Sequence, residues 1–248
     1  MGAAGSPCLP GSSLPAERCE VESTKEEIYD PSPSSRWLAA ILLAASASFI
    51  VYAQSKLPAD LDPQSRARLP YLKKSDLDAK GQKVLETFAS KDDTLRGPLA
   101  FAAYNTAVAQ ALLDLHNAAV VGGTLDPHTR ELAILVACRE TNYNLEWNAH
   151  EPSGLKAGID AKVIDVVRYN RPLAALNEKD ATVIRFGRQM FHDKRVDSAT
   201  FAKAVELWGK RGTMDMVAVM NTYAVSGYFA IAVDERSQEG KPELPGVK

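Results

Sequence analysis

The chain has 248 residues, which is enough for one large domain or two small ones. Apolar residues make up 46% and charged residues 24%, as in an ordinary soluble globular protein, and the formal net charge of -2 gives no indication of a nucleic-acid partner. Two of the three cysteines, Cys8 and Cys19, lie near the N-terminus, so the composition excludes a disulfide framework or a CxxC motif in the body of the chain.

The N-terminal part divides into two segments. Residues 1–35 are rich in Ser, Pro, Gly and Glu without a hydrophobic period, which predicts a disordered tail. Residues 36–53 contain a strongly apolar run at 38–51, too short for a typical membrane span but suited to a signal-peptide core, with Val-Tyr-Ala at its end. We therefore expect export, periplasmic or secreted, with cleavage after Ala53. A membrane anchor formed by 37–53, or a buried core helix, is the alternative. The acidic tail in front is unusual for a signal peptide and leaves open whether Met1 is the true start.

The sequence pattern of the body of the chain predicts helices. Residues 54–77 are polar and interrupted by prolines, which predicts an arm or linker. Helical periodicity follows over 78–233, and the tail 234–248 looks loose. Pro, Gly and Asn interruptions together with capping residues predict helices over the following ranges: 78–91, 99–120, 126–141, 143–158, 159–170, 178–192, 198–210 and 213–233.

Two stretches, starting at Leu125 and Leu176, share a capping residue, an acidic first turn and an apolar stripe. They lie about fifty residues apart, as in a duplicated helical hairpin. Because no stretch alternates with period two and no Asn-Gly or Asp-Gly turn occurs, the sequence predicts an all-α fold built from a helical-hairpin repeat.

The stretch "ETNYNLEWNAHEP" carries the candidate site. Tyr143, Glu146 and His150 follow one another at spacings that share one helix face, and Glu131 lies on the preceding helix. If the two helices are antiparallel neighbours, Glu131 approaches His150. A carboxylate fixes the imidazole tautomer and raises its pKa, which suits proton transfer. The Tyr143 hydroxyl would be a hydrogen-bond donor on the same helix face.

Other interpretations stand beside this one. Glu and His one turn apart also occur on ordinary solvated helices. Metal binding is a weaker reading, since the four histidines form neither HxH nor HExxH. Cys138, on the apolar helix, is expected to be a buried small hydrophobic residue.

A resemblance adds to this reading. Residues 130–159 resemble the carboxymuconolactone decarboxylase family, which shares its fold with alkyl hydroperoxidase D, and a looser similarity covers roughly residues 80 to 232. The residues that carry it are Arg130-Glu131-Leu132 at the start of an apolar helix, Glu146-Trp147 with His150, and the turn Gly158-Ile159.

The resemblance implies an all-α protein that forms homo-oligomers, trimers or hexamers. In the hydroperoxidase branch a relay runs from Glu through a CxxC pair to His. By position, Glu131 and His150 match the relay residues, while Tyr143 and Glu146 stand where the two cysteines would be. Because both thiols are absent, the resemblance favours the decarboxylase branch.

The function expected from these observations is a cofactor-independent lyase, a decarboxylase or isomerase acting on a lactone or an unsaturated carboxylic acid. In it His150 is the general acid/base, oriented by Glu131 and assisted by Glu146 or Tyr143. Export would argue against an intracellular ring-cleavage substrate, so a different small molecule is expected. The alternatives are a peroxidase acting through Cys138 and a non-catalytic oligomeric binding protein. No nucleic acid is expected as a partner, and a membrane only through an uncleaved N-terminal segment.

Overall fold

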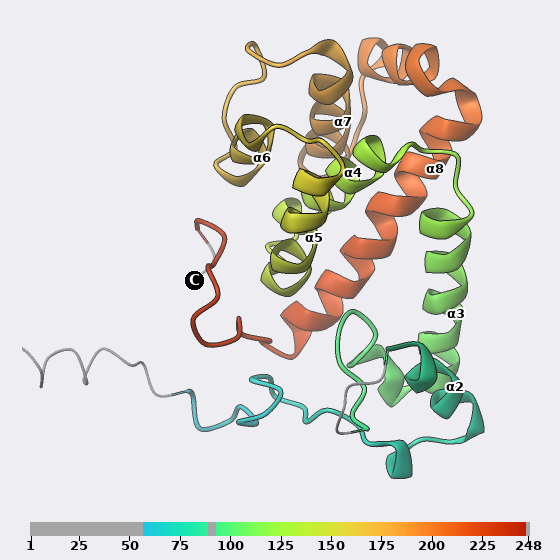
Figure 1. Ribbon diagram of the computed structural model, residues 1–248, viewed down its shortest axis with the longest axis vertical. Coiled ribbons are helices and arrows are strands. Elements are labelled where there is room, and N and C mark those ends of the chain that lie inside the picture. The colour runs from blue at the N-terminus through green and yellow to red at the C-terminus, as the bar shows by residue number, and fades with distance from the viewer. Residues whose placement is uncertain (1–56, 89–92, 247–248) are drawn as a thin grey trace, which may run out of the picture. The chain divides into compact units, whose positions relative to one another are not determined.

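The computed structural model describes residues 57–88 and 93–246 (Figure 1). The predicted tail 1–35 and the predicted signal peptide or anchor at 36–53 lie outside these residues. Within the described ranges, no helix is long and apolar enough to cross a membrane.

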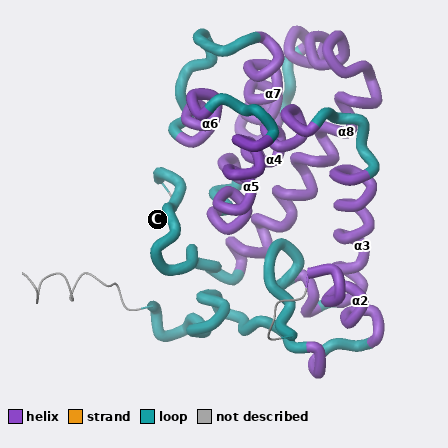
Figure 2. The backbone as a smooth tube through the Cα atoms, in the orientation of Figure 1, coloured by secondary structure: helices purple, strands orange, loops and turns teal. Residues whose placement is uncertain are grey.

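The predicted all-α fold class is confirmed. The described residues form helices joined by loops, with only one isolated bridge, between Lys73 and Thr94 (Figure 2). The α-helices are α2 Ala79–Phe88, α3 Thr106–His116, α4 Pro127–Glu140, α5 Asn144–Lys156, α6 Ala161–Arg168, α7 Glu178–Arg188 and α8 Ser198–Ala232. Four short helical turns accompany them: η1 Lys74–Asp76, η2 Ala102–Tyr104, η3 Asn117–Val121 and η4 Gln189–Asp193.

Several helices begin where a side-chain oxygen accepts a hydrogen bond from a first-turn backbone amide, which has no partner within the helix. Asp126 accepts from the Thr129 amide ahead of α4, where Pro127 occupies the first turn, and Asp160 accepts from Lys162 ahead of α6. The helix predicted over 99–120 begins later, at Thr106. Asn105 provides its N-cap there, and the residues before it form turns.

The longest helix, α8, contains a break. Gly209 has φ 69° and ψ 174°, a backbone conformation that glycine adopts without steric cost. The sequence predicts one helix ending at Lys210 and another starting at Thr213, so the observed interruption lies one residue before the predicted end of the first helix.

The core is organised around α4. The run from Leu132 to Cys138 is buried on every side, and α5, α7 and α8 pack against it. A helix that is buried all round needs no amphipathic stripe, which explains why its apolar residues are consecutive.

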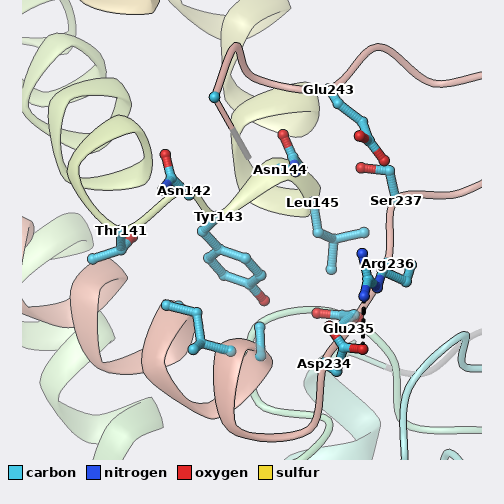
Figure 3. A pocket seen from close by; sticks show the side chains of 14 residues that line it. Thr141, Asn142, Tyr143, Asn144, Leu145, Asp234, Glu235, Arg236, Ser237 and Glu243 are labelled. Carbon is cyan, nitrogen blue, oxygen red and sulfur yellow. Dashed lines mark hydrogen bonds and ion pairs between the residues drawn. The ribbon is translucent and has the colours of Figure 1, made fainter. Parts of the chain in front are cut away.

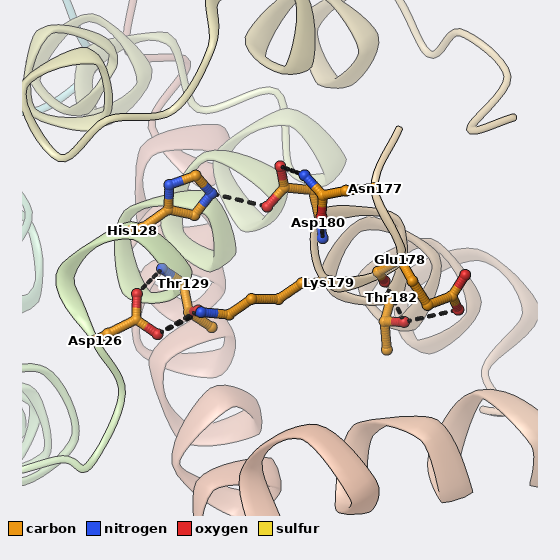
Figure 4. Close-up of polar contacts among 8 residues, drawn as sticks. All are labelled: Asp126, His128, Thr129, Asn177, Glu178, Lys179, Asp180 and Thr182. Carbon is orange, nitrogen blue, oxygen red and sulfur yellow. Dashed lines mark hydrogen bonds and ion pairs between the residues drawn. The ribbon is translucent and has the colours of Figure 1, made fainter. Parts of the chain in front are cut away.

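The N-termini of the two repeat-like helices, α4 and α7, are joined by polar contacts (Figure 4). His128 Nε2 lies 2.8 Å from Asp180 Oδ1, and Lys179 Nζ donates to Asp126 Oδ2 at 2.9 Å. These contacts fix the start of α4, the helix that carries Glu131.

Non-helical segments at both ends of the described chain pack on the helices. The Arg68 amide donates to the Val233 carbonyl at 2.7 Å, and the Arg236 amide donates to the Arg66 carbonyl at 3.0 Å. Further on, Leu244 is buried and its amide donates to Asn144 Oδ1 at 2.6 Å. The segment after α8 is thus held against the start of α5.

Candidate functional site

The structure brings Glu131, Glu146 and His150 together. His150 Nδ1 lies 2.8 Å from Glu131 Oε2, a hydrogen bond between α5 and α4. His150 Nε2 lies 3.4 Å from Glu146 Oε2, one turn earlier on α5. One imidazole is therefore flanked by two carboxylates, with the shorter contact across the helix pair.

This cluster is only partly accessible to water. The side chain of His150 is 19% exposed, that of Glu131 13% and that of Glu146 8%. Burial by itself would lower the pKa of His150, but the hydrogen bonds to Glu131 and Glu146 outweigh it and raise the pKa to about 9. The imidazole therefore carries a proton on both nitrogens at neutral pH.

Tyr223 of α8 closes the cluster from the side. Its ring lies edge-on to His150, with the ring centroids 4.9 Å apart, and its other neighbour is the His116 ring at 6.4 Å. The small space lined by Tyr223 and His116 has a volume of about 10 Å³, which is room for about one water. His150 does not line this space.

Tyr143 has a different position from Glu146 and His150. It is the N-cap of α5, with ψ 85°, so its side chain does not follow the helix face that the spacing predicts. No hydrogen bond or ring contact joins it to His150 among the described residues. Instead it lines a cavity of about 280 Å³ with residues 234–237 (Figure 3). Burial, with a contribution from Glu235, raises the pKa of its hydroxyl well above the usual value.

Cys138 is fully buried inside α4, as the sequence predicts. Burial raises the pKa of its thiol, and the charges of Glu146 and Glu131 raise it further. The thiolate, which is the nucleophilic form, is thus disfavoured.

Arg139 and Arg168, two cations on α4 and α6, are held by contacts within the chain. Arg168 forms an ion pair with Glu151, and its guanidinium lies 5.5 Å from the centre of the Trp147 ring. Arg139 donates to Asn142 Oδ1 and to two backbone carbonyls. Within residues 57–88 and 93–246, no group of three or more His, Cys, Asp and Glu side chains is arranged to hold a metal ion.

Two residues near the site have no signal in the sequence. Tyr223 lies in a long apolar helix, where a tyrosine is expected to be a residue of the hydrophobic core. Glu235 follows the last helix, in a segment that looks loose. Only the packing of α8 and of the chain beyond it brings them near α5.

Comparison with solved structures supports the fold. A crystal structure of an uncharacterized peroxidase-related protein from Silicibacter sp. TM1040 aligns with a TM-score of 0.56 and 16% sequence identity, covering 74% of this chain and 97% of that chain. No family model matches the chain, and no curated protein matches it. The chain thus has an alkyl hydroperoxidase D-like helical fold. At this identity the likeness shows the fold alone and does not confirm membership of the carboxymuconolactone decarboxylase family.

Proposed function

We propose that the chain is a cofactor-independent lyase, of the decarboxylase or isomerase type, that acts on a lactone or an unsaturated carboxylic acid. His150 is the proton donor, positioned by Glu131. The observation that carries the proposal is the 2.8 Å contact between His150 Nδ1 and Glu131 Oε2, made by two residues 19 positions apart.

The two nitrogens of the His150 imidazole have different roles. The Nδ1 proton is held by Glu131 in the shorter contact, so it fixes the ring orientation. The Nε2 proton faces Glu146 at 3.4 Å, a looser contact, and is the one available for transfer. Because the pKa of His150 is raised to about 9, the group starts the reaction as an acid.

The decarboxylation proceeds without an oxidant or a reductant. The bond between the ring carbon and the carboxylate breaks, and its electron pair passes through the unsaturated system to the lactone carbonyl, leaving a dienolate. His150 then donates the Nε2 proton to a ring carbon, and the neutral imidazole recovers a proton from solvent at its exposed edge. For an isomerase the imidazolium first donates its Nε2 proton to one carbon, and the neutral imidazole then removes a proton from another carbon of the same molecule.

A peroxidase is the second candidate, because the structural neighbour is described as a peroxidase-related protein. The only cysteine in the described ranges is Cys138, and its burial and raised pKa argue against a thiol mechanism. A non-catalytic oligomeric binding protein is the third candidate.

Export and homo-oligomer formation, as a trimer or hexamer, are part of the same proposal. Exposed apolar side chains on α8, including Tyr228 and Ile231, support an oligomer. Light scattering of the purified chain measures its mass.

The experiment is a decarboxylation screen in D2O with carboxylated unsaturated lactones and β,γ-unsaturated acids. Carbon dioxide release and the position of deuterium in the product are measured. We expect deuterium on one face of the ring carbon. Activity should be lost in His150→Gln and should persist in His128→Gln, the matched control, which changes another histidine paired with a carboxylate. A substrate converted equally well by His150→Gln would refute the role of His150. No conversion of any compound in the panel would favour the binding protein.

A further inference from the structure

A cavity in the described part of the chain lies away from His150. Its volume is about 280 Å³, and it opens between the turn before α5, the last turn of α8 and the segment that follows α8 (Figure 3). This corresponds to roughly nine waters' worth of space and lies just below the usual size range of small-molecule sites. Its apolar wall includes Leu145, Ala230 and Ile231.

Polar groups on the other wall lack partners. Glu235 Oε2, Arg236 Nε and Ser237 Oγ are buried, and none has a hydrogen-bond partner within the described chain. Ser237 is only 8% exposed. Buried polar atoms without partners are costly, so three of them beside one cavity indicate that something else completes their hydrogen bonds.

The charge of this wall is unbalanced. Asp234 is paired with Arg236, whose Nη2 donates to Asp234 Oδ2 at 2.9 Å. Among the ion pairs of residues 57–88 and 93–246, none neutralises Glu235. Its Oε1 accepts from the Tyr71 hydroxyl, at 3.5 Å, and the Tyr143 hydroxyl points toward it across the cavity (Figure 3).

We infer that this cavity binds a small organic amine with an apolar body and one hydroxyl or carbonyl group. The ammonium pairs with the Glu235 carboxylate, the apolar body lies against Leu145 and Ile231, and the oxygen accepts from Arg236 Nε or Ser237 Oγ. The inference does not rest on the proposed acid–base role of His150, because neither His150 nor Glu131 lines the cavity.

Binding of an amine depends on the ionisation of Glu235. Burial, together with the charge of Glu146, raises the pKa of Glu235 to about 7, whereas the Tyr71 hydroxyl acts in the opposite direction. The other charged or titratable groups at the cavity are Asp234, Arg236, Glu243 and the Tyr143 hydroxyl. Asp234 pairs with Arg236 and also lies 3.9 Å from Arg68, so the wall keeps an excess of negative charge. Above pH 7 the carboxylate is free to pair with an ammonium, so the affinity rises by roughly tenfold from pH 6 to pH 8.

The test is calorimetric titration of the full chain with tyramine, which has ten non-hydrogen atoms, an ammonium and a hydroxyl. Tyrosol replaces the ammonium by a hydroxyl, and 4-hydroxyphenylacetate has a carboxylate in place of the aminomethyl group, so the three probes differ in charge at one end. We expect tyramine to bind most tightly, tyrosol weakly and 4-hydroxyphenylacetate least.

Two variants locate the binding. Glu235→Gln should weaken the binding of tyramine by about tenfold to a hundredfold and remove its dependence on pH. Glu239 is an exposed carboxylate on the same segment, outside the cavity. Glu239→Gln should therefore leave both the affinity and its pH dependence unchanged. Leu145→Trp, which fills the cavity without touching the charge, should also abolish binding if Glu235→Gln does not fold. Tighter binding of the carboxylate probe, an unchanged affinity in both cavity variants, or no tyramine binding up to about 10 mM would each overturn the inference.

Discussion

Replacing Glu131 by Gln should weaken the dependence of stability on pH, because Glu131 helps to hold a proton on His150. The folded pKa is about 9 and the ordinary value 6.5. Below pH 6.5 both the folded and the unfolded chain bind the proton, and the stabilisation is complete. As the pH rises toward 9 only the folded chain keeps it, so the stability falls and the contribution is lost above that pH.

The magnitude follows from one pKa unit being worth about 1.4 kcal/mol. Between pH 7 and 9 the wild-type chain should lose roughly 2 kcal/mol of unfolding free energy through His150. Most of this window lies above the pKa of Glu235, which is about 7, so Glu235 contributes only a small part of the change. In Glu131→Gln only Glu146 remains to oppose burial, so the loss should fall to about 1 kcal/mol or less.

The assay is urea unfolding followed by circular dichroism, at fixed protein concentration and ionic strength, at several pH values from 7 to 9. Glu206→Gln, which changes an exposed carboxylate paired with Lys203, controls for the exchange of Glu by Gln. In a His150→Gln background, Glu131→Gln should have no further effect on the slope. The reasoning is refuted if Glu131→Gln keeps the wild-type slope, or if it changes the slope equally without His150.

Two further predictions concern the centre of the fold. Gly187→Ala should lower the unfolding free energy by about 1–3 kcal/mol, measured by urea unfolding, because the added Cβ would lie 2.3 Å from Val136 Cγ1 at the contact of α7 with α4; an unchanged free energy would contradict this packing. Cys138→Ala should not alter the number of thiols that react with an aromatic disulfide reagent in the native chain, and should lower it by one in denaturant, because Cys138 is fully buried. One thiol fewer in the native variant would mean that Cys138 is accessible.

Local sequence signals were sufficient for much of the fold. Asp126 followed by Pro127 predicts the start of α4, and Gly209 lies at the break that separates the two halves of α8. Both depend on interactions within a few residues, which a single sequence contains. The start of α3 was misplaced because alanines at 99–103 favour a helix, although Asn105 caps the chain only at Thr106.

The pairing of Glu131 with His150 was within reach of the sequence because it needs only two consecutive antiparallel helices. The position of Tyr143 was not, since an N-cap residue leaves the helical conformation and its side chain leaves the predicted face. The contact of Tyr223 with His150 and the cavity at Glu235 depend on how α8 and the segment after it pack, which neither periodicity nor spacing encodes.

The most direct test of the account is an NMR titration of His150 in the full chain with labelled imidazoles, the His150 signal being assigned from its absence in His150→Gln. A midpoint near 9 that falls in Glu131→Gln would agree with an imidazolium held by Glu131 and available as a proton donor. A midpoint near the ordinary value of about 6.5, unchanged by Glu131→Gln, would contradict it and leave the two residues as neighbours on a helix pair.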